Sequence, residues 1–479
     1  MTGTSGRPRA GRTRRGISAL AAVMTAQLAA VQAAAAQPPG ALGPRGPDAA
    51  AELQRAFADR VGVAGGLTAE QAAARAVRHS PAAARRRDDV AIAASELAST
   101  RLEFLPRASL SGRYTRLSST PDTAIEGLPV PVTLPGALEN QWAFGAQVSV
   151  PLSDYVLRLG HAVAARRHSE RSAGWMSVAE RRQAAADARV AYYDWARARL
   201  GVLVAERAHA QAVQHRRLAE NRLAAASATR ADVLTAQARV GEAEDLVTRS
   251  RLGANLAERR LRVLMGDAGR APLTIGEDVL ASLPAQSGDV ERLVGEALGA
   301  RPELRALGEG AGALASQSAL EGARFLPRLD LVGDLARENP SSRAFPQRDR
   351  FETVWDVSAV VSWSLDDLPR AREARRELAA RSAQVGDQRR ELVDGIVLEV
   401  HRAAQEVSAA ETSIQTSRGT LVAAEEAHRV RERLFEVGSA SSTELGDAET
   451  ELTRARFAAI DAQVALRKAH VALDLATGR

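Results

Sequence analysis

The chain has 479 residues and a formal net charge of +6, with 45% apolar, 25% charged and only 4% aromatic residues, a mixture that favours long helices over an aromatic-rich core. Five of the positive charges are arginines within residues 1–36, so the remainder is nearly neutral and lacks the basic surface that binds nucleic acid. The absence of cysteine excludes disulfides, thiolate metal sites, a cysteine nucleophile and a cysteine-linked lipid anchor.

Residues 1–36 are organised like a secretory signal peptide. Basic residues at 7–15 precede a short alanine-rich apolar run at 17–31, and small residues then offer a cleavage site before two prolines at 38–39. A disordered basic tail is the alternative. No later stretch holds eighteen consecutive apolar residues, so we expect a mature protein that is periplasmic, secreted, or held in the outer membrane by β-structure.

The sequence after the signal region contains the same structural unit twice. The sequence Phe-Leu-Pro-Arg at 104–107 returns at 325–328, and further identities follow in the same order. These are Leu110/Leu331, Gly112/Gly333, Trp142/Trp355, Val148/Val361, Leu152/Leu365, Ser227/Ser439, Ala228/Ala440 and Gly266/Gly478. We infer an internal duplication. An N-terminal extension over 37–66 then precedes a first repeat at 67–266, a linker at 267–288, and a second repeat at 289–479.

Each repeat is expected to begin with a proline-interrupted helix and to end with two long helices. The Phe-Leu-Pro-Arg motif stops the first helix, because proline removes an amide donor and disfavours helix at the residue before it. A helix of about 70 residues is roughly 100 Å long, and its small alanines allow close packing as in coiled coils. The helices are predicted at 68–102, 155–225 and 230–265, and again at 289–323, 369–436 and 442–477.

Four short segments alternate with a period of two residues, with apolar side chains on one face and mostly Ser, Asp or Gln on the other. This pattern fits membrane-barrel strands that face lipid and lumen. Four strands cannot close a barrel around a lumen, so either a soluble sheet rests on the helices or several copies share one barrel. The export signal and the long helices favour the second option. The strands are predicted at 107–116, 142–153, 328–335 and 355–366, with Tyr114, Trp142, Trp355 and Trp363 at the lipid interfaces.

The mature chain resembles the TolC family of outer-membrane efflux proteins. The resemblance rests on the duplication, the two Phe-Leu-Pro-Arg motifs, and the sequence Gly-Ser-Ala-Ser-Ser-Thr-Glu-Leu at 438–445 between two long helices. Gly446 departs from the family's usual leucine. In the first repeat Ala226 replaces the glycine, although Asp232-Val233-Leu234 fits the pattern.

The resemblance implies a mainly α-helical fold with a small β part. In a homotrimer, each copy gives four strands to a twelve-stranded barrel in outer-membrane lipid, and the long helices form an α-barrel through the periplasm. The residues before the first helix and those near 267–290 form an equatorial girdle. The implied function is a passive conduit of a tripartite efflux or type I secretion system, not an enzyme, and no cofactor is expected. A periplasmic adaptor (membrane-fusion) protein and an inner-membrane pump of the RND or ABC type are the implied partners, whereas the cargo, a drug, metal ion or polypeptide, stays open.

The same resemblance makes the helical turns at 223–232 and 435–447 the periplasmic mouth. Glu444 and Asp447 take the places of the family's constriction acids, and Asp232 adds a third carboxylate. A spacing of three puts Glu444 and Asp447 on one helix face, and rings of carboxylates favour cations. The alternative is that Glu444 and Asp447 are first-turn acids that complement a helix dipole.

Small residues at the turns are candidate adaptor contacts, with simple turn chemistry as the alternative. They are Ser227, Thr229, Gly438, Ser439 and Ser441. The eight histidines are scattered and form no ligand motif, so neither a catalytic nor a metal site is expected. The rival interpretations are a periplasmic adaptor, which would have one hairpin between β-rich segments, and a soluble structural coiled coil.

Overall fold

The computed structural model describes residues 55–125, 132–134, 136–283, 289–345 and 347–479. The chain divides into two units, Met1–Glu52 and Leu53–Arg479. The predicted export signal lies in the first unit and therefore outside the described residues.

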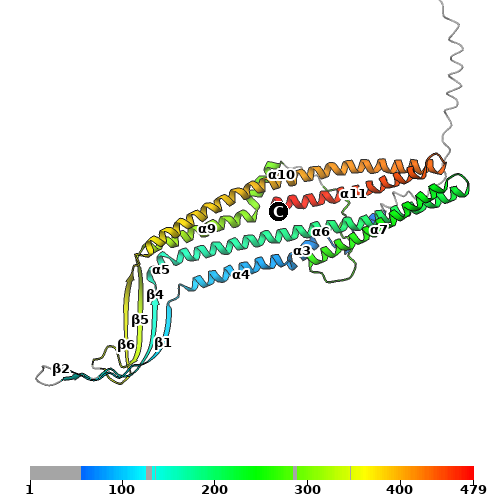
Figure 1. The fold of residues 1–479 in the computed structure, drawn as a ribbon. Coiled ribbons are helices and arrows are strands. Elements are labelled where there is room, and N and C mark those ends of the chain that lie inside the picture. The colour runs from blue at the N-terminus through cyan, green and yellow to red at the C-terminus, as the bar shows by residue number, and fades with distance from the viewer. Residues whose placement is uncertain (1–54, 126–131, 135, 284–288, 346) are drawn as a thin grey trace, which may run out of the picture. The chain divides into compact units, whose positions relative to one another are not determined.

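Helices make up most of the second unit, and they repeat in order (Figure 1). The first repeat contains α3 (Ala69–His79), α4 (Pro81–Leu102), α5 (Leu152–Leu157), α6 (Leu159–Ala224) and α7 (Arg230–Met265). The second contains α8 (Val290–Ala300), α9 (Pro302–Gly322), the 3-10 turn η1 (Ala323–Phe325), α10 (Asp367–Glu436) and α11 (Ser442–Ala476). The proline-interrupted helices and the long helical pairs confirm the predicted element order.

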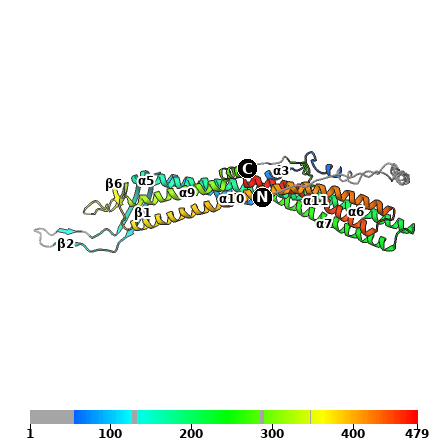
Figure 2. The same cartoon turned by 90° about the horizontal axis from the view of Figure 1, so that it is seen from above.

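One antiparallel sheet unites the two repeats. Its order is β1 (Arg107–Arg116), β4 (Asn140–Val150), β5 (Arg328–Asn339) and β6 (Glu352–Ser362), with β1 and β6 at its edges. A small hairpin of β2 (Thr123–Ile125) and β3 (Val132–Leu134) extends the β1–β4 connection. Within this unit the sheet lies at one end of the helices and the two long-helix turns lie at the other (Figures 1 and 2).

Several element boundaries differ from the prediction, among them the end of β5, which runs to Asn339 rather than to residue 335. The strand predicted at 142–153 ends at Val150, because residues from Leu152 onward turn into α5 directly after Pro151, which cannot donate a ladder hydrogen bond. The helix predicted from 155 is broken at Arg158. The last strand covers 352–362 rather than 355–366, so Trp363 lies just beyond its end.

The duplication is visible in how each repeat closes on itself. Gly266 ends α7 with φ +64°, and a Cβ there would lie 2.6 Å from the His79 ring. Gly478 follows α11 with φ +73°, and a Cβ there would lie 3.1 Å from the carbonyl carbon of Ala300. Because His79 and Ala300 are the equivalent last residues of α3 and α8, each long helical pair ends against the same point of its own repeat.

Buried apolar side chains form three clusters along the helices. The largest surrounds Trp195 on α6 and takes in Ile275 and Val279 of the segment between the repeats. A second joins α8 and α9 to α10 and α11, and a third lies between the two turns. Among the described helices, none combines the length and the apolar composition needed to span a bilayer.

Candidate functional site at the paired helix turns

The turns that join α6 to α7 and α10 to α11 have the same backbone structure. Ala226 (φ +53°) and Gly438 (φ +86°) are the left-handed residues. The next amide donates back across the helix end, from Ser227 N to Arg222 O at 2.8 Å and from Ser439 N to Leu434 O at 2.8 Å. These bonds satisfy carbonyls that the helix end leaves open, as in a Schellman motif.

Each following helix then starts with a capping box. The Thr229 hydroxyl accepts from Asp232 N (3.2 Å), and a carboxylate oxygen of Asp232 accepts from Thr229 N (2.9 Å). Ser441 and Glu444 repeat the exchange at 3.2 and 2.8 Å. The pKa of Asp232 lies below its usual value, chiefly because the Thr229 hydroxyl donates to the carboxylate and secondly because the Thr229 amide does. The pKa of Glu444 is lowered in the same way, chiefly by the Ser441 amide and secondly by the Ser441 hydroxyl.

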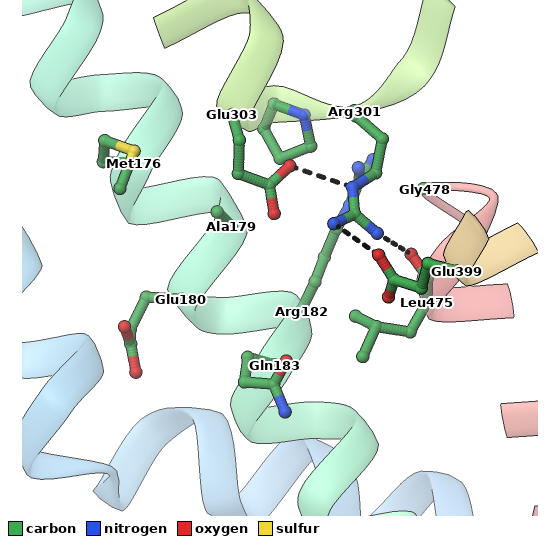
Figure 3. Close-up of a pocket in the computed structure, with 11 residues that line it drawn as sticks. Met176, Ala179, Glu180, Arg182, Gln183, Arg301, Glu303, Glu399, Leu475 and Gly478 are labelled. Atoms are coloured by element: carbon green, nitrogen blue, oxygen red, sulfur yellow. Dashed lines mark hydrogen bonds and ion pairs between the residues drawn. The ribbon is translucent and has the colours of Figure 1, made fainter. Parts of the chain in front are cut away.

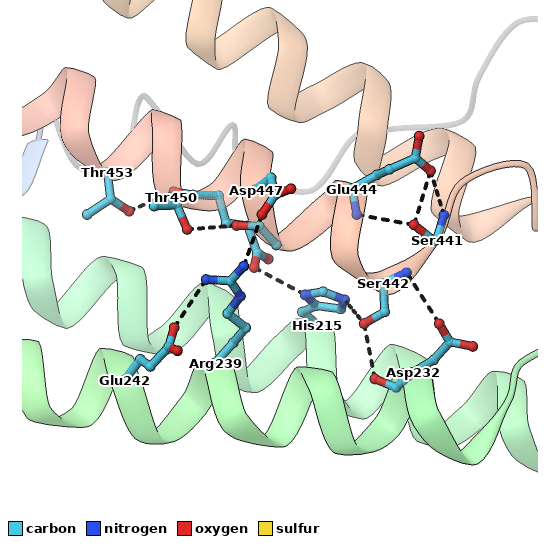
Figure 4. A network of polar contacts seen from close by, with 12 residues as sticks. His215, Asp232, Arg239, Glu242, Ser441, Ser442, Glu444, Asp447, Thr450 and Thr453 are labelled. Atoms are coloured by element: carbon cyan, nitrogen blue, oxygen red, sulfur yellow. Dashed lines mark hydrogen bonds and ion pairs between the residues drawn. The ribbon is translucent and has the colours of Figure 1, made fainter.

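The three predicted constriction acids all have partners within the chain (Figure 4). Glu444 pairs with Arg431 at 2.9 Å, Asp447 pairs with Arg239 at 3.0 Å, and Asp232 accepts from Ser442 N at 3.4 Å. The side chains of Glu444 and Asp447 remain 48% and 67% exposed. Glu444 and Asp232 thus lie in the first turns of α11 and α7, while a role at a constriction stays a prediction.

Apolar and cationic contacts hold the two turns against each other. Ala219 and Ala236 of the first hairpin pack with Phe435, Ala440 and Leu445 of the second. The Arg222 guanidinium donates to Phe435 O at 2.7 Å and to Ser227 O at 2.7 Å, and it lies 4.6 Å from the Phe435 ring centroid. One arginine thus links both turns.

No motif or pattern in the sequence singled out His215 on α6. Its side chain is fully buried, with Nδ1 3.1 Å from a carboxylate oxygen of Glu449 and Nε2 3.0 Å from the Ser442 hydroxyl. The spacing of Ala212, His215, Ala219 and Arg222, which follow one another at three and four residues, indicates only that they share one helix face.

The small turn residues proposed as adaptor contacts are exposed. They are Ser227, Thr229, Gly438, Ser439 and Ser441. Thr229 and Ser441 are also the two N-caps, and Ser227 donates to Arg222 O at 3.1 Å. Turn chemistry therefore accounts for part of this composition, and docking stays a prediction.

The predicted interface aromatics lie on or next to the sheet. Tyr114 and Trp142 face each other across β1 and β4, with ring centroids 4.4 Å apart. Trp355 pairs with Leu335 on β5, and Trp363 follows β6 at the helix end of the sheet. All four are between 42% and 69% exposed.

A cavity of about 200 Å³ lies where α8 meets α9, far from the turns (Figure 3). Arg301 there pairs with Glu303 and Glu399, both at 3.1 Å, and donates to Leu475 O at 3.1 Å. Because this arginine already pairs with two carboxylates and caps the end of α11, we assign the residues around the cavity a structural role in packing α9 against α10 and α11. In the described part of the chain, no group of three or more His, Cys, Asp or Glu residues is arranged to hold a metal ion.

Comparison with known proteins finds one family model that matches part of the chain and several solved structures that share its fold. Residues 293–479 match the model of the family described as outer membrane efflux protein. None of the curated proteins matches the chain significantly. Among solved structures, the channel-forming CusC superposes with a TM-score of 0.71 at 16% identity, covering 86% of this chain and 92% of that one.

Two further channels give the same result. The outer-membrane channel OprN has a TM-score of 0.70 at 19% identity, over 86% of this chain and 89% of its own. VceC of Vibrio cholerae, an outer membrane protein, has a TM-score of 0.69 at 18% identity, over 86% and 96%. The predicted fold class and the resemblance to outer-membrane efflux proteins are confirmed.

Proposed function

We propose that this chain, whose residues 293–479 form an outer membrane efflux protein domain, is a passive exit duct that spans the outer membrane and extends into the periplasm. Its sheet forms part of the membrane-spanning wall. Its long helices form the periplasmic tube, and the paired turns form the entrance. Binding and conformational change are sufficient for such a device, and the energy for export comes from a partner pump.

The exposed apolar face and the unpaired edges of the four-stranded sheet are the main support for this proposal. Its apolar face is bare, with Leu110 87% exposed, Val361 69% exposed and Val357 64% exposed. Exposed apolar surface of this extent on a sheet marks contact with lipid or protein. Each edge strand, β1 and β6, also pairs on one side only in the described part of the chain, and unpaired edges invite pairing with another chain.

A trimer would cover the exposed apolar face with lipid and would also pair the free strand edges. If β6 of one copy pairs with β1 of the next, three sheets close into twelve strands, which exceeds the eight of the smallest outer-membrane barrels. Closure then leaves no edge, and the apolar faces meet lipid. The polar faces, which carry Asp334 and Asp356 directly opposite each other, line the lumen.

The partners follow from the position of the entrance. A periplasmic adaptor docks at the exposed small residues of the turns, and an inner-membrane pump of the RND or ABC type supplies cargo. The rival interpretation as an adaptor would require one long hairpin flanked by β-rich segments, whereas the described part of this chain has two long helical hairpins and a four-stranded sheet that both repeats share.

Fractionation of a Gram-negative host that expresses the full chain tests the proposal. We expect the protein in the outer-membrane fraction, as a trimer that runs intact in detergent gels and falls to a monomer on heating. A soluble periplasmic monomer would contradict the proposal and favour the structural coiled coil. In the same host, export of a fluorescent dye by a matching pump should require the chain.

A further inference from the structure

The charged residues of the four-stranded sheet are divided unevenly between its two faces. By the strand register, every aspartate and glutamate of β1, β4, β5 and β6 lies on the polar face. The charged side chains that these strands place on the apolar face are Arg116 and Arg337. Both belong to the end of the sheet that lies away from the helices (Figure 1). The surface that meets lipid in the proposed duct is therefore positively charged at one end and uncharged at the other.

Arg337 lacks an anionic partner among the described residues. Arg116 pairs with Glu139 at 3.1 Å, whereas the strand neighbours of Arg337 are the uncharged Phe144 and Thr353. Its Nη1 lies 3.4 Å from the Thr353 hydroxyl, and its guanidinium carbon lies 5.8 Å from the Phe351 ring centroid. A guanidinium has five N–H donors, so most of its capacity to donate hydrogen bonds is unused within the chain.

A neighbouring copy of the chain does not supply the missing acceptor. β5 is an inner strand, with β4 on one side and β6 on the other. In the proposed trimer the copies join through the edge strands, and the apolar face that carries Arg337 meets the bilayer. A cation that loses water on this face requires a new partner, and that partner has to be a lipid.

A row of aromatic side chains shows where the apolar layer ends on this side. The ring centroids of Tyr114 and Trp142 are 4.4 Å apart, and those of Trp142 and Phe144 are 6.5 Å apart. Phe144 lies 6.4 Å from Phe351, and Arg337 is next to both of these rings. Aromatic girdles are typical of the interfaces of membrane barrels, so Arg337 lies at the level of the lipid head groups.

The length of β5 gives the same level. Leu329, on the apolar face near the helices, precedes Arg337 by eight residues, which span about 26 Å along a strand. A strand tilt near 40° reduces this to about 20 Å across the membrane, close to the apolar band of about 25 Å in membrane barrels. Arginine is tolerated at that boundary, and its planar fork binds phosphate oxygens through two parallel hydrogen bonds.

The position of the uncharged end identifies the leaflet. In the proposed duct the helical turns face the periplasm, so Arg337 lies in the outer leaflet and Leu329 and Val361 lie in the inner one. The outer leaflet of a Gram-negative outer membrane consists of glycolipid with phosphomonoester groups, whereas the inner leaflet consists of phospholipid. A phosphomonoester carries more negative charge than a phosphodiester and offers three acceptor oxygens. The arginine is therefore on the side where the stronger anion is found.

We propose that Arg337, flanked by Phe144 and Phe351, is a binding site for a phosphate group of the outer-leaflet glycolipid, with one such site on each copy of the trimer. The guanidinium binds the phosphate, and the two rings pack against the adjoining sugar and acyl groups. This proposal rests on the proposed function, because it names the lipid that covers one part of the proposed barrel.

Native mass spectrometry of the purified full-length trimer, with bis-phosphorylated lipid A added in steps, tests the site. We expect Arg337→Gln to weaken lipid retention about tenfold, because a charge-assisted pair is lost. Arg113→Gln removes an arginine from the same end of the sheet but from its polar face, and it should bind lipid as the wild type does. Equal retention in Arg337→Gln and wild type, or equal weakening in both variants, would overturn the proposal.

A comparison of lipids on the wild type requires no variant and so remains decisive if Arg337→Gln fails to assemble. Dephosphorylated lipid A and phosphatidylglycerol should each bind about tenfold more weakly than bis-phosphorylated lipid A, and equimolar inorganic phosphate should not displace the glycolipid. Equal binding of dephosphorylated lipid A would reject a phosphate site. Equal binding of phosphatidylglycerol, or displacement by inorganic phosphate, would reject the glycolipid as its ligand.

Thiol labelling of intact cells separates this proposal from the proposed function. The chain contains no cysteine, so Ser342→Cys in the exposed β5–β6 loop and Ser227→Cys in the first helical turn each carry a single thiol. A membrane-impermeant maleimide should label the first in intact cells and the second only after the outer membrane is permeabilised. External labelling of Ser342→Cys without an effect of Arg337→Gln on lipid retention rejects the lipid site alone. Labelling of Ser342→Cys only after permeabilisation, with lipid retention that depends on Arg337, rejects the proposed duct alone.

Discussion

At the scale of single residues, the two turns share one backbone shape but not one sequence. The left-handed position is glycine in the second repeat and Ala226 in the first. A residue with a Cβ pays roughly 1–2 kcal/mol for this conformation, an energy partly offset by the larger entropy that glycine loses on folding. The first turn is therefore the less stable of an otherwise matched pair.

Ala226→Gly should slow local opening of the first turn, with a gain of about 0.5–1 kcal/mol. Hydrogen exchange at the amides of residues 225–229 measures this energy directly. Gly438→Ala is the matched control and should lose a similar amount at the second turn. Equal exchange rates in Ala226→Gly and wild type would show that Ala226 is not strained.

The capping carboxylates predict a dependence of turn stability on pH. The folded-state pKa of Asp232 and that of Glu444 lie below their ordinary values, so their stabilisation is complete above the unfolded pKa of about 4. It is lost as the pH falls through the folded pKa. Turn amides should therefore lose protection from exchange below about pH 4, and Asp232→Asn should remove that dependence at the first turn only.

At the scale of elements, a buried arginine fastens the segment between the repeats to the helices. Arg467 of α11 pairs with Glu277 at 2.6 Å and donates to the carbonyl oxygens of Val279 and Asp278 at 2.9 and 2.7 Å. Its guanidinium also lies 5.9 Å from the Tyr193 ring centroid. The segment therefore depends on one side chain for most of its polar contacts with α11.

Arg467→Met should cost about 3 kcal/mol, because it leaves a carboxylate and several carbonyls without their donor. Lys468→Met is the control, since Lys468 is 38% exposed and makes a single pair with Asp194, which is worth less than about 1 kcal/mol. Limited proteolysis between residues 270 and 283 should accelerate in the first variant only. Equal cleavage in both would show that apolar packing alone holds the segment.

The sequence predicted the long helices well because the apolar spacing that indicates them is visible within a few residues. Strand ends were less predictable, since Leu152 continues the alternation of β4 yet belongs to α5, where Pro151 interrupts the ladder. The β2–β3 hairpin was not predicted.

The role of His215 was not predictable for a different reason. Its partners Ser442 and Glu449 lie more than two hundred residues away along the chain, and the contact depends on how two hairpins pack. Neither helical periodicity nor composition contains that information.

At the scale of the whole molecule, a charge placed on the exposed apolar face of the sheet would distinguish a lipid-facing sheet from a soluble one. Leu110→Arg should abolish or strongly reduce assembly in the outer membrane, because arginine near the bilayer midplane costs about 2–4 kcal/mol per copy. Ser111→Arg, its neighbour on the polar face, should assemble normally. If the sheet were soluble, the 87% exposed Leu110 would tolerate arginine without loss, and trimer yield in the membrane fraction would be unchanged.

Disulfide trapping between the edge strands tests the central claim most directly. A cysteine at Ser109 or Ser111 of β1, combined with one at Ser358 or Ser362 of β6, cannot react within a protomer, since β4 and β5 separate these strands. Oxidation of at least one pair should convert the protein into a covalent trimer with no free thiols, because three copies close the ring. Absence of cross-links at every pair, or a ladder that runs beyond three chains, would contradict a single cylinder built from three sheets.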